Sequence, residues 1–350
     1  MSRGTTSFVE FHGLFIFARS VVAVDRELRG GSYVMTSDAN ANASTNANAK
    51  MRAAIISVVS NTLLVIGKIV AGMLSGSISI VSEGIHSGID LIAALIAYFA
   101  VKESSKPADA IHKYGHGKIE NISGTVEALL IIVAAVWIIF EAGHKLLAGG
   151  SVEQLGWGMA IMAISALVNL YVSNTLMRTA KATDSVALKA DAMHLRTDIY
   201  TSVGVFIGLL GIKLTGITWL DPIAALGVAV LIIKAGIDMT KQAFFPLVDV
   251  SLPQEEEAVI VNVIESFSHE YLEFHKLRTR KAGSERHIDL HLVVPKDAPV
   301  HRVHDLCDAI EAEIKQRLPG AQVLIHIEPC DPGKCDICST ASPNCMDNQE

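Results

Sequence analysis

The sequence predicts an α-helical membrane protein with six transmembrane helices and a small cytoplasmic αββαβ (ferredoxin-like) C-terminal domain. Half of the 350 residues are hydrophobic, only 19% are charged, and the mean hydropathy is +0.39. This balance suits a bilayer better than water. A helix needs about 20 mostly apolar residues to cross a membrane, and such stretches alternate here with polar or turn-rich breaks. The predicted spans are residues 53–74, 78–101, 120–143, 156–178, 185–212 and 219–240.

Lysine and arginine residues in the short loops orient these spans, because cytoplasmic loops carry an excess of both. Outer loops would carry only Lys145 and Lys213 if the N-terminus is inside. The cytoplasmic flanks would then carry Lys50, Arg52, Lys102, Lys106, Lys113, Lys118, Arg178, Lys181, Lys189 and Lys241. An even number of spans places both termini in the cytoplasm. We expect Lys68 and Lys234, which fall within spans, to snorkel toward a membrane surface.

Residues 1–50 form an N-terminal extension for which we expect no packed structure. The run SDANANASTNANAK is polar and of low complexity, and such a composition cannot bury a core. Met35 and Met51 are alternative starts, so the extension is either disordered or a mis-annotated part of the sequence. The transmembrane domain is expected over residues 51–245. A bacterial inner (plasma) membrane is the default location for so compact a chain.

Residues 250–329 are expected to fold as a separate cytoplasmic domain. LPQEEEAVIVNVIESF reads as an amphipathic helix with acidic residues in its first turn. Two strand-like runs, FHKLRTRKAG and RHIDLHLVVP, follow on either side of a Gly-Ser turn. A helix over residues 299–318, ended by Pro319 and Gly320, and a last strand, QVLIHIE, complete the αββαβ order.

Two pairs of ionisable residues fall inside predicted spans. His86 and Asp90 lie in the second span, and His194 and Asp198 lie in the fifth. A spacing of four residues places both side chains of a pair on one helix face, and both pairs fall near the bilayer middle. Burying one ionisable residue there costs at least about 2.5–3.5 kcal/mol of free energy. Four such residues together therefore need a binding partner that offsets this cost. Two imidazoles and two carboxylates form a tetrahedral set that suits Zn²⁺, although a proton relay without metal uses the same residue types.

These motifs, the six spans and the αββαβ tail resemble the cation diffusion facilitator family of metal/proton antiporters over residues 51–330. The resemblance implies that His86, Asp90, His194 and Asp198 form the transport site. Some bacterial members have Asp in place of His86, and the His version is associated with a preference for zinc. Cadmium, cobalt and iron stay open as substrates. The resemblance also implies a homodimer that is steadied by a charge pair between Lys118 and Asp249.

Further metal ligands are predicted on the cytoplasmic side. Asp109, His112 and His116 lie within eight positions of one loop, which suggests either a weak metal site or a solvated polar loop, and the resemblance favours the metal site. In the C-terminal domain, the positions that match metal ligands of the family are His275, His291, His304, His326 and Glu328. Glu328 replaces an Asp of the family pattern. The resemblance implies that zinc bound here bridges or closes the two tail domains of the dimer.

The last residues, 330–350, form a cysteine-rich tail that has no match in the family pattern. Cys330, Cys335, Cys338 and Cys345 are soft ligands that suit Zn²⁺ or Cu⁺. A disordered tail of reduced thiols explains them equally well, since the cytoplasm is reducing.

The sequence therefore predicts a secondary transporter that exports a divalent transition metal, preferably zinc, in exchange for protons. No P-loop is present, which disfavours an ATP-driven pump, and no organic cofactor is expected. A net charge of −7 without a basic cluster excludes nucleic acid as a partner. Two alternatives stay open: an intramembrane zinc-dependent hydrolase, and a metal sensor that acts through the C-terminal domain.

Overall fold

The computed structural model describes residues 38–75, 78–148, 157–215 and 219–330. The chain divides into two compact units, Met1–Phe244 and Phe245–Glu350, which are treated separately below. The expected spans and the expected C-terminal domain fall in different units.

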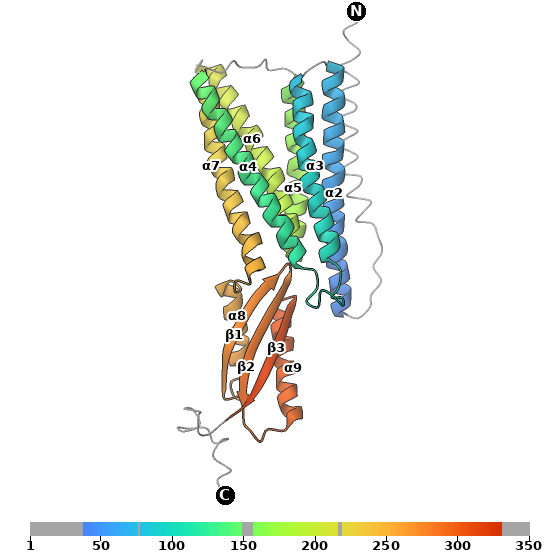
Figure 1. Ribbon diagram of the computed structural model, residues 1–350, viewed down its shortest axis with the longest axis vertical. Helices are drawn as coiled ribbons and strands as arrows, with labels where there is room; N and C mark the ends of the chain where they lie inside the picture. The colour runs from blue at the N-terminus through green and yellow to red at the C-terminus, as the bar shows by residue number, and fades with distance from the viewer. Residues whose placement is uncertain (1–37, 76–77, 149–156, 216–218, 331–350) are drawn as a thin grey trace, which may run out of the picture. The chain divides into compact units, whose positions relative to one another are not determined.

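Six long helices make up the described part of the first unit and run alongside one another (Figure 1). Each overlaps one of the six predicted spans. They are α2 (Asp38–Ser75), α3 (Ile78–Ser104), α4 (Lys118–Ala148), α5 (Trp157–Thr183), α6 (Val186–Thr215) and α7 (Leu220–Phe244).

Four of these helices are long and apolar enough to cross a membrane within the described residues: the segments Ser44–Leu74, Gly84–Ser104, Lys118–His144 and Pro222–Val248. The remaining two predicted spans fall on α5 and α6. The first half of α6 carries Lys189, Asp191, Arg196 and Asp198, and these charges lower its mean hydropathy. The number of spans therefore stays a prediction for these two helices.

Helix α2 begins at Asp38, so it includes residues 38–50, for which no packed structure was expected. The segment from Asp38 to Lys50 was expected to be disordered because it is polar. It is rich in alanine, the best helix former, and adding a turn to an existing helix is far cheaper than starting a new one. Residues 1–37 of the predicted extension lie outside the described residues.

Small residues let the helices of the first unit approach one another closely. Ala53, Ala180 and Ala192 are buried in the contact between α2, α5 and α6. A Cβ atom added at Gly72 would lie 2.6 Å from a methyl carbon of Val81, and one at Gly84 would lie 2.9 Å from Ile69 Cγ1. Glycine at these two positions therefore allows the backbones of α2 and α3 to pack side by side.

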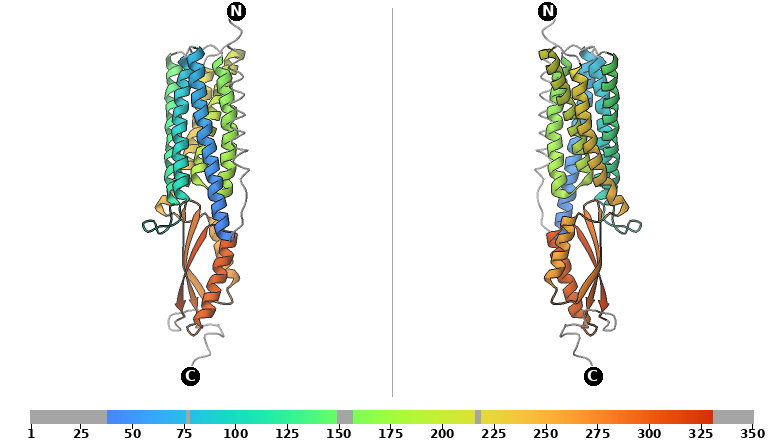
Figure 2. Two further views of the ribbon diagram at one scale, coloured as in Figure 1. Left: turned by 90° about the vertical axis from the view of Figure 1, so that its right-hand side faces the viewer. Right: turned by 90° about the vertical axis from the view of Figure 1, so that its left-hand side faces the viewer.

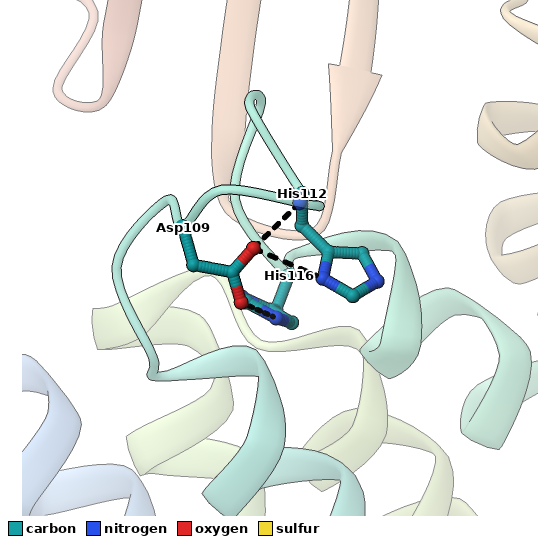
Figure 3. Close-up of side chains that lie close together, drawn as sticks. All are labelled: Asp109, His112 and His116. Atoms are coloured by element: carbon teal, nitrogen blue, oxygen red, sulfur yellow. Dashed lines mark hydrogen bonds and ion pairs between the residues drawn. The ribbon is translucent and has the colours of Figure 1, made fainter.

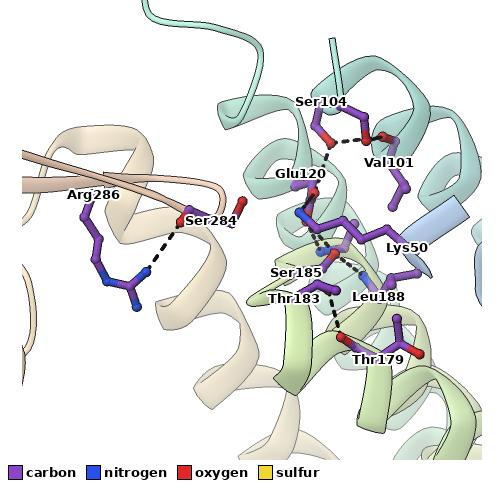
Figure 4. Close-up of polar contacts among 12 residues, drawn as sticks. Lys50, Val101, Ser104, Glu120, Thr179, Thr183, Ser185, Leu188, Ser284 and Arg286 are labelled. Carbon is purple, nitrogen blue, oxygen red and sulfur yellow. Dashed lines mark hydrogen bonds and ion pairs between the residues drawn. The ribbon is translucent and has the colours of Figure 1, made fainter. Parts of the chain in front are cut away.

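A buried carboxylate joins four helices (Figure 4). Glu120, in the first turn of α4, accepts hydrogen bonds from Lys50 Nζ at 2.9 Å and from Ser104 Oγ at 3.0 Å. Its other oxygen accepts from Ser185 Oγ at 2.5 Å. Ser185 also caps α6, because its Oγ accepts from the backbone N–H of Leu188 at 3.3 Å. The Glu120 carboxylate thus joins α2 and the end of α3 to the starts of α4 and α6.

The second unit has the predicted αββαβ order. After a 3₁₀ turn, η1 (Phe245–Val248), its elements are α8 (Gln254–Ser266), β1 (Glu273–Ala282), β2 (Glu285–Val294), α9 (Val300–Arg317) and β3 (Ala321–Pro329). The sheet order is β1-β2-β3, with β1 antiparallel and β3 parallel to β2.

Both helices of the second unit cover one face of this sheet (Figure 2). On β2, Ile288, Leu290 and Leu292 are fully buried against Ile260 and Ile310 of the two helices. Successive side chains of a strand point to opposite faces, so the alternate residues of β2 lie on the face that the helices leave open.

Candidate metal centre

The two predicted His/Asp pairs lie together in the first unit. His86 and Asp90 are four residues apart on α3, and His194 and Asp198 are four residues apart on α6. Ligand atoms of His86, Asp90 and Asp198 all lie within 4.8 Å of one another. His194 joins this group through its Nε2 atom, which lies 3.2 Å from Oδ1 of Asp90. The structure therefore brings all four predicted residues to one place.

One contact in this group has the spacing of neighbouring ligands around a tetrahedral cation. Around Zn²⁺, with ligand bonds of about 2.0–2.1 Å, neighbouring ligand atoms are about 3.3 Å apart. The contact of 3.2 Å between His194 and Asp90 is close to that value. Asp90 and His194 are buried, Asp198 is half-buried and His86 is exposed, so the pair Asp90 and His194 is the sheltered part of the site. Two carboxylates and two imidazoles in this setting can exchange protons for a metal ion.

Lys68 is buried rather than extended toward a membrane surface, so the expectation of snorkelling was wrong for this residue. Its side chain is 5% exposed, and its Nζ donates a hydrogen bond to Ser87 Oγ at 2.8 Å. Ser87 follows His86 directly on α3. The close contact between α2 and α3 turns Lys68 inward, which no local pattern in the sequence reveals.

Two further buried carboxylates were missed by the sequence analysis. Glu127 of α4 and Asp191 of α6 are both fully buried. Glu127 Oε1 accepts from Ser123 Oγ at 3.2 Å, whereas neither oxygen of Asp191 has a hydrogen-bond partner among the described residues. Asp191 precedes His194 by one helical turn and therefore lies on the same side of α6. Its presence three residues before a predicted ligand was a usable signal.

The predicted loop site is assembled around one carboxylate (Figure 3). Asp109 Oδ1 accepts from the backbone N–H groups of Ile111 and His112 at 2.8 and 2.6 Å. These hydrogen bonds, above all the one from His112, lower the pKa of Asp109 to about 2. His112 Nδ1 lies 3.3 Å from Asp109 Oδ1, and His116 Nε2 lies 3.4 Å from Asp109 Oδ2. A carboxylate and two imidazoles within 4.8 Å form a ready set of metal ligands.

Three histidines form a row across the sheet of the second unit. His275 of β1 pairs with His291 of β2, which in turn pairs with His326 of β3. Glu328 Oε1 lies 2.7 Å from His291 Nδ1, and its Oε2 lies 3.2 Å from His275 Nε2. The contact with His291 lowers the pKa of Glu328. This row lies on the sheet face that α8 and α9 leave open.

The remaining predicted site residues do not join these clusters. His304 lies on α9, is 72% exposed, and has Asp308 as its neighbour at 3.4 Å. Asp249 belongs to the second unit, where Arg280 Nη1 is 3.5 Å away, and Lys118 belongs to the first, so their charge pair stays a prediction.

Of the predicted tail ligands, only Cys330 is described. It is buried, and its backbone N–H donates to Val294 O at 2.8 Å, so it extends the end of the sheet. Cys335, Cys338 and Cys345 lie outside the described residues.

Comparison with known protein families identifies the family of this chain. The model of the cation efflux transmembrane domain matches residues 54–248, and that of the cation efflux protein's cytoplasmic domain matches residues 252–330. The chain belongs to the cation diffusion facilitator family. Members of this family are transporters rather than enzymes, and the chain is an integral membrane protein. The resemblance inferred from the motifs is thereby confirmed.

Named relatives of this cation diffusion facilitator cover most of its length. The transporter sll1263 of Synechocystis sp. is 36% identical over 76% of this chain and 86% of that protein. The cation-efflux pump FieF of Citrobacter koseri is 30% identical over 80% of this chain and 92% of that protein. A solved structure of CzrB in its Zn form is 41% identical and covers 25% of this chain and 97% of that chain, with a TM-score of 0.23.

Proposed function

We propose that this cation diffusion facilitator exports Zn²⁺ from the cytoplasm in exchange for protons. The observation that carries the proposal is the meeting of two His/Asp pairs from different helices, α3 and α6. Nitrogen and carboxylate ligands in equal number favour Zn²⁺ over calcium and magnesium, which prefer all-oxygen shells. His86 supplies the ligand on which discrimination against cadmium and other neighbours depends.

Proton exchange follows from the chemistry of the same atoms. A neutral imidazole or an ionised carboxylate binds the metal, whereas its protonated form does not. Protons that reach His86, Asp90, His194 and Asp198 from the outer side therefore compete with the metal and promote its release there. Imidazole groups are suited to this competition because their ordinary pKa lies near neutrality.

The remaining features of the proposal concern assembly and placement. The second unit matches the cytoplasmic domain of cation efflux proteins. This match supports cytoplasmic termini and a homodimer. The row His275–His291–His326 with Glu328 would bind Zn²⁺ as a regulatory or bridging ion. We place the protein in a bacterial inner membrane and assign the charge pair of Lys118 and Asp249 to the dimer.

Flux measurements separate this proposal from the hydrolase and the sensor. Purified protein is reconstituted into vesicles with an imposed pH gradient, and zinc movement is followed with a fluorescent indicator. We expect zinc and protons to move in opposite directions, and Asp198→Ala to abolish both fluxes in a folded protein. The matched control is Asp305→Ala, an exposed carboxylate of α9, which should leave the flux unchanged. Undiminished exchange in the Asp198 variant contradicts the assigned site.

A further inference from the structure

An arginine of α6 lies where α6 meets α5 at the surface of the first unit, a line of contact called the α5–α6 seam below. Arg196 is half-buried, and its Nη2 donates a hydrogen bond to Oδ1 of Asn174, an exposed residue of α5, at 3.3 Å. Its Nε donates to Ser173 Oγ at 3.2 Å. Ser173 is fully buried and donates its own proton to the carbonyl oxygen of Ala192 at 2.8 Å. A buried hydroxyl group thus holds the guanidinium group at the seam.

The charge of Arg196 is not neutralised by these two contacts, because a hydroxyl group and an amide are both uncharged. Among the described residues, no carboxylate lies within ion-pair distance of the guanidinium group. A guanidinium group has five N–H donors, so several are left over. Arg196 also falls inside the predicted fifth span, where a charged group is costly. An anion that reaches the seam from outside the helix bundle would therefore stabilise this residue.

The direction of the side chain brings this charge toward the predicted cytoplasmic surface. Arg196 follows the start of α6 at Val186 by about 15 Å along the helix axis. Helical side chains lean toward the N-terminus of their helix, and a long arginine stem carries the charge several Å further in that direction. On α5, the exposed residues Arg178 and Lys181 follow Asn174 toward the same surface. The seam therefore presents basic groups that approach the depth of lipid headgroups.

Two tyrosines border the seam on the side of the membrane interior. Tyr171 comes one turn before Asn174 on α5, and Tyr200 comes one turn after Arg196 on α6. Their side chains are 37% and 42% exposed, so their rings are available to lipid. Tyrosine is enriched where hydrocarbon meets the headgroups. Basic groups toward the surface and aromatic rings beneath them match the layout of a phospholipid, with its phosphate above its acyl chains.

We propose that the α5–α6 seam binds the headgroup of an anionic phospholipid, whose phosphate is held by Arg196, Asn174 and Arg178. A guanidinium group suits this ligand because its planar fork of donors matches two phosphate oxygens. Basic pockets between membrane helices on the cytoplasmic side commonly bind anionic headgroups. A bound phosphate also explains how the charge of Arg196 is accommodated in α6, which is not among the four most apolar helices. The inference rests on the prediction that α5 and α6 cross the membrane and is independent of the transported ion.

The test measures lipid binding to the full chain in detergent by native mass spectrometry. Phosphatidylglycerol is the anionic lipid, phosphatidylcholine is the zwitterionic one, and inorganic phosphate is added as a competitor in a separate arm. Arg196→Gln removes the charge but keeps a hydrogen-bonding side chain, Arg196→Lys keeps the charge, and Asn174→Ala removes the exposed amide. Lys234→Gln is the matched control, because Lys234 is an exposed basic residue within another predicted span.

We expect the wild-type protein to bind phosphatidylglycerol in preference to phosphatidylcholine. Arg196→Gln should weaken the binding of phosphatidylglycerol by about tenfold, as expected for the loss of charge-assisted hydrogen bonds. Arg196→Lys should lose less, because it keeps the charge but not the fork of donors. Asn174→Ala should weaken binding by about threefold, and Lys234→Gln should stay near wild type.

Equal binding of phosphatidylglycerol by the wild type and Arg196→Gln, or an equal loss in Lys234→Gln, overturns the inference. Displacement of the lipid by inorganic phosphate also overturns it, since the seam would then be a site for free anions. Dissociation of a dimer in Arg196→Gln, with unchanged lipid per chain, shows instead that the seam faces a second copy of the chain. If Arg196→Gln does not fold, unchanged lipid binding in Asn174→Ala, which alters only an exposed side chain, overturns the inference.

Discussion

Replacing Glu120 should destabilise the membrane unit more than replacing any exposed carboxylate. Its side chain is 1% exposed and that of Lys50 is 8% exposed, and the two are 2.9 Å apart. Removing one partner of a buried ion pair costs about 3–5 kcal/mol, because the other charge stays buried. Glu120→Gln preserves the shape but replaces the carboxylate 2.9 Å from the ammonium of Lys50 with a neutral amide. We therefore expect Glu120→Gln to lower the free energy of unfolding by about 3 kcal/mol or more.

The measurement is reversible unfolding in mixed detergent micelles, applied to a double-mutant cycle. Lys50→Met alone should cost a similar amount, whereas the double variant should cost clearly less than the sum, since no unpaired charge remains. The control is the exposed pair Lys106 and Glu103, whose side chains are 54% and 42% exposed. Glu103→Gln should cost about 1 kcal/mol or less. Equal effects of Glu120→Gln and Glu103→Gln, or strict additivity in the cycle, would refute the reasoning.

Three other predictions follow from the metal sites and the tail. His86→Asp should keep zinc flux but raise cadmium flux relative to it, and an unchanged ratio of the two would contradict the role given to His86. At the loop, Asp109 stays ionised down to about pH 4 because its lowered pKa is about 2, and its interactions are lost only as the pH falls from there through about 2. Protonation of Asp109 should therefore not limit zinc binding at the loop above about pH 4. Asp109→Asn should lower the zinc affinity of an isolated loop peptide at every pH above about 4, and equal affinities of the two peptides would argue against Asp109 as a ligand. Deletion of residues 331–350 should leave zinc flux unchanged, since Cys330 closes the sheet; loss of flux would show that the distal cysteines take part.

The placement of each His/Asp pair on one helix face could be predicted because its evidence is local. A spacing of four residues fixes the face of a helix on which His86 and Asp90 lie, whatever surrounds that helix. The same argument applies to His194 and Asp198. By contrast, the burial of Lys68 depends on Gly72 and Gly84, which bring α2 and α3 together, and the sequence pattern around Lys68 does not differ from that of a snorkelling lysine. Asp38–Lys50 was misjudged for a related reason, since its helical state depends on the span that follows.

The predicted ligands of the cytoplasmic domain also divide into features that the sequence reveals and features that depend on the tertiary structure. Strand periodicity places His291 on the sheet face opposite Leu290 and Leu292, and this could be inferred from the sequence. That His275 and His326 pair with His291 depends on strand order and register, which are set by the packing of α8 and α9 on the other face.

By itself, the sequence determined that the first unit belongs in a membrane, which helices carry the two His/Asp pairs, and that the second unit has the order αββαβ. These features follow from hydropathy and periodicity, which are properties of neighbouring residues. Only the tertiary structure decided which distant groups meet. It showed His194 against Asp90, Lys68 buried and hydrogen-bonded to Ser87, and the carboxylate of Glu120 in contact with three other helices. Such contacts depend on how whole helices pack, and the charge of each buried group is balanced only by partners that lie far away along the chain.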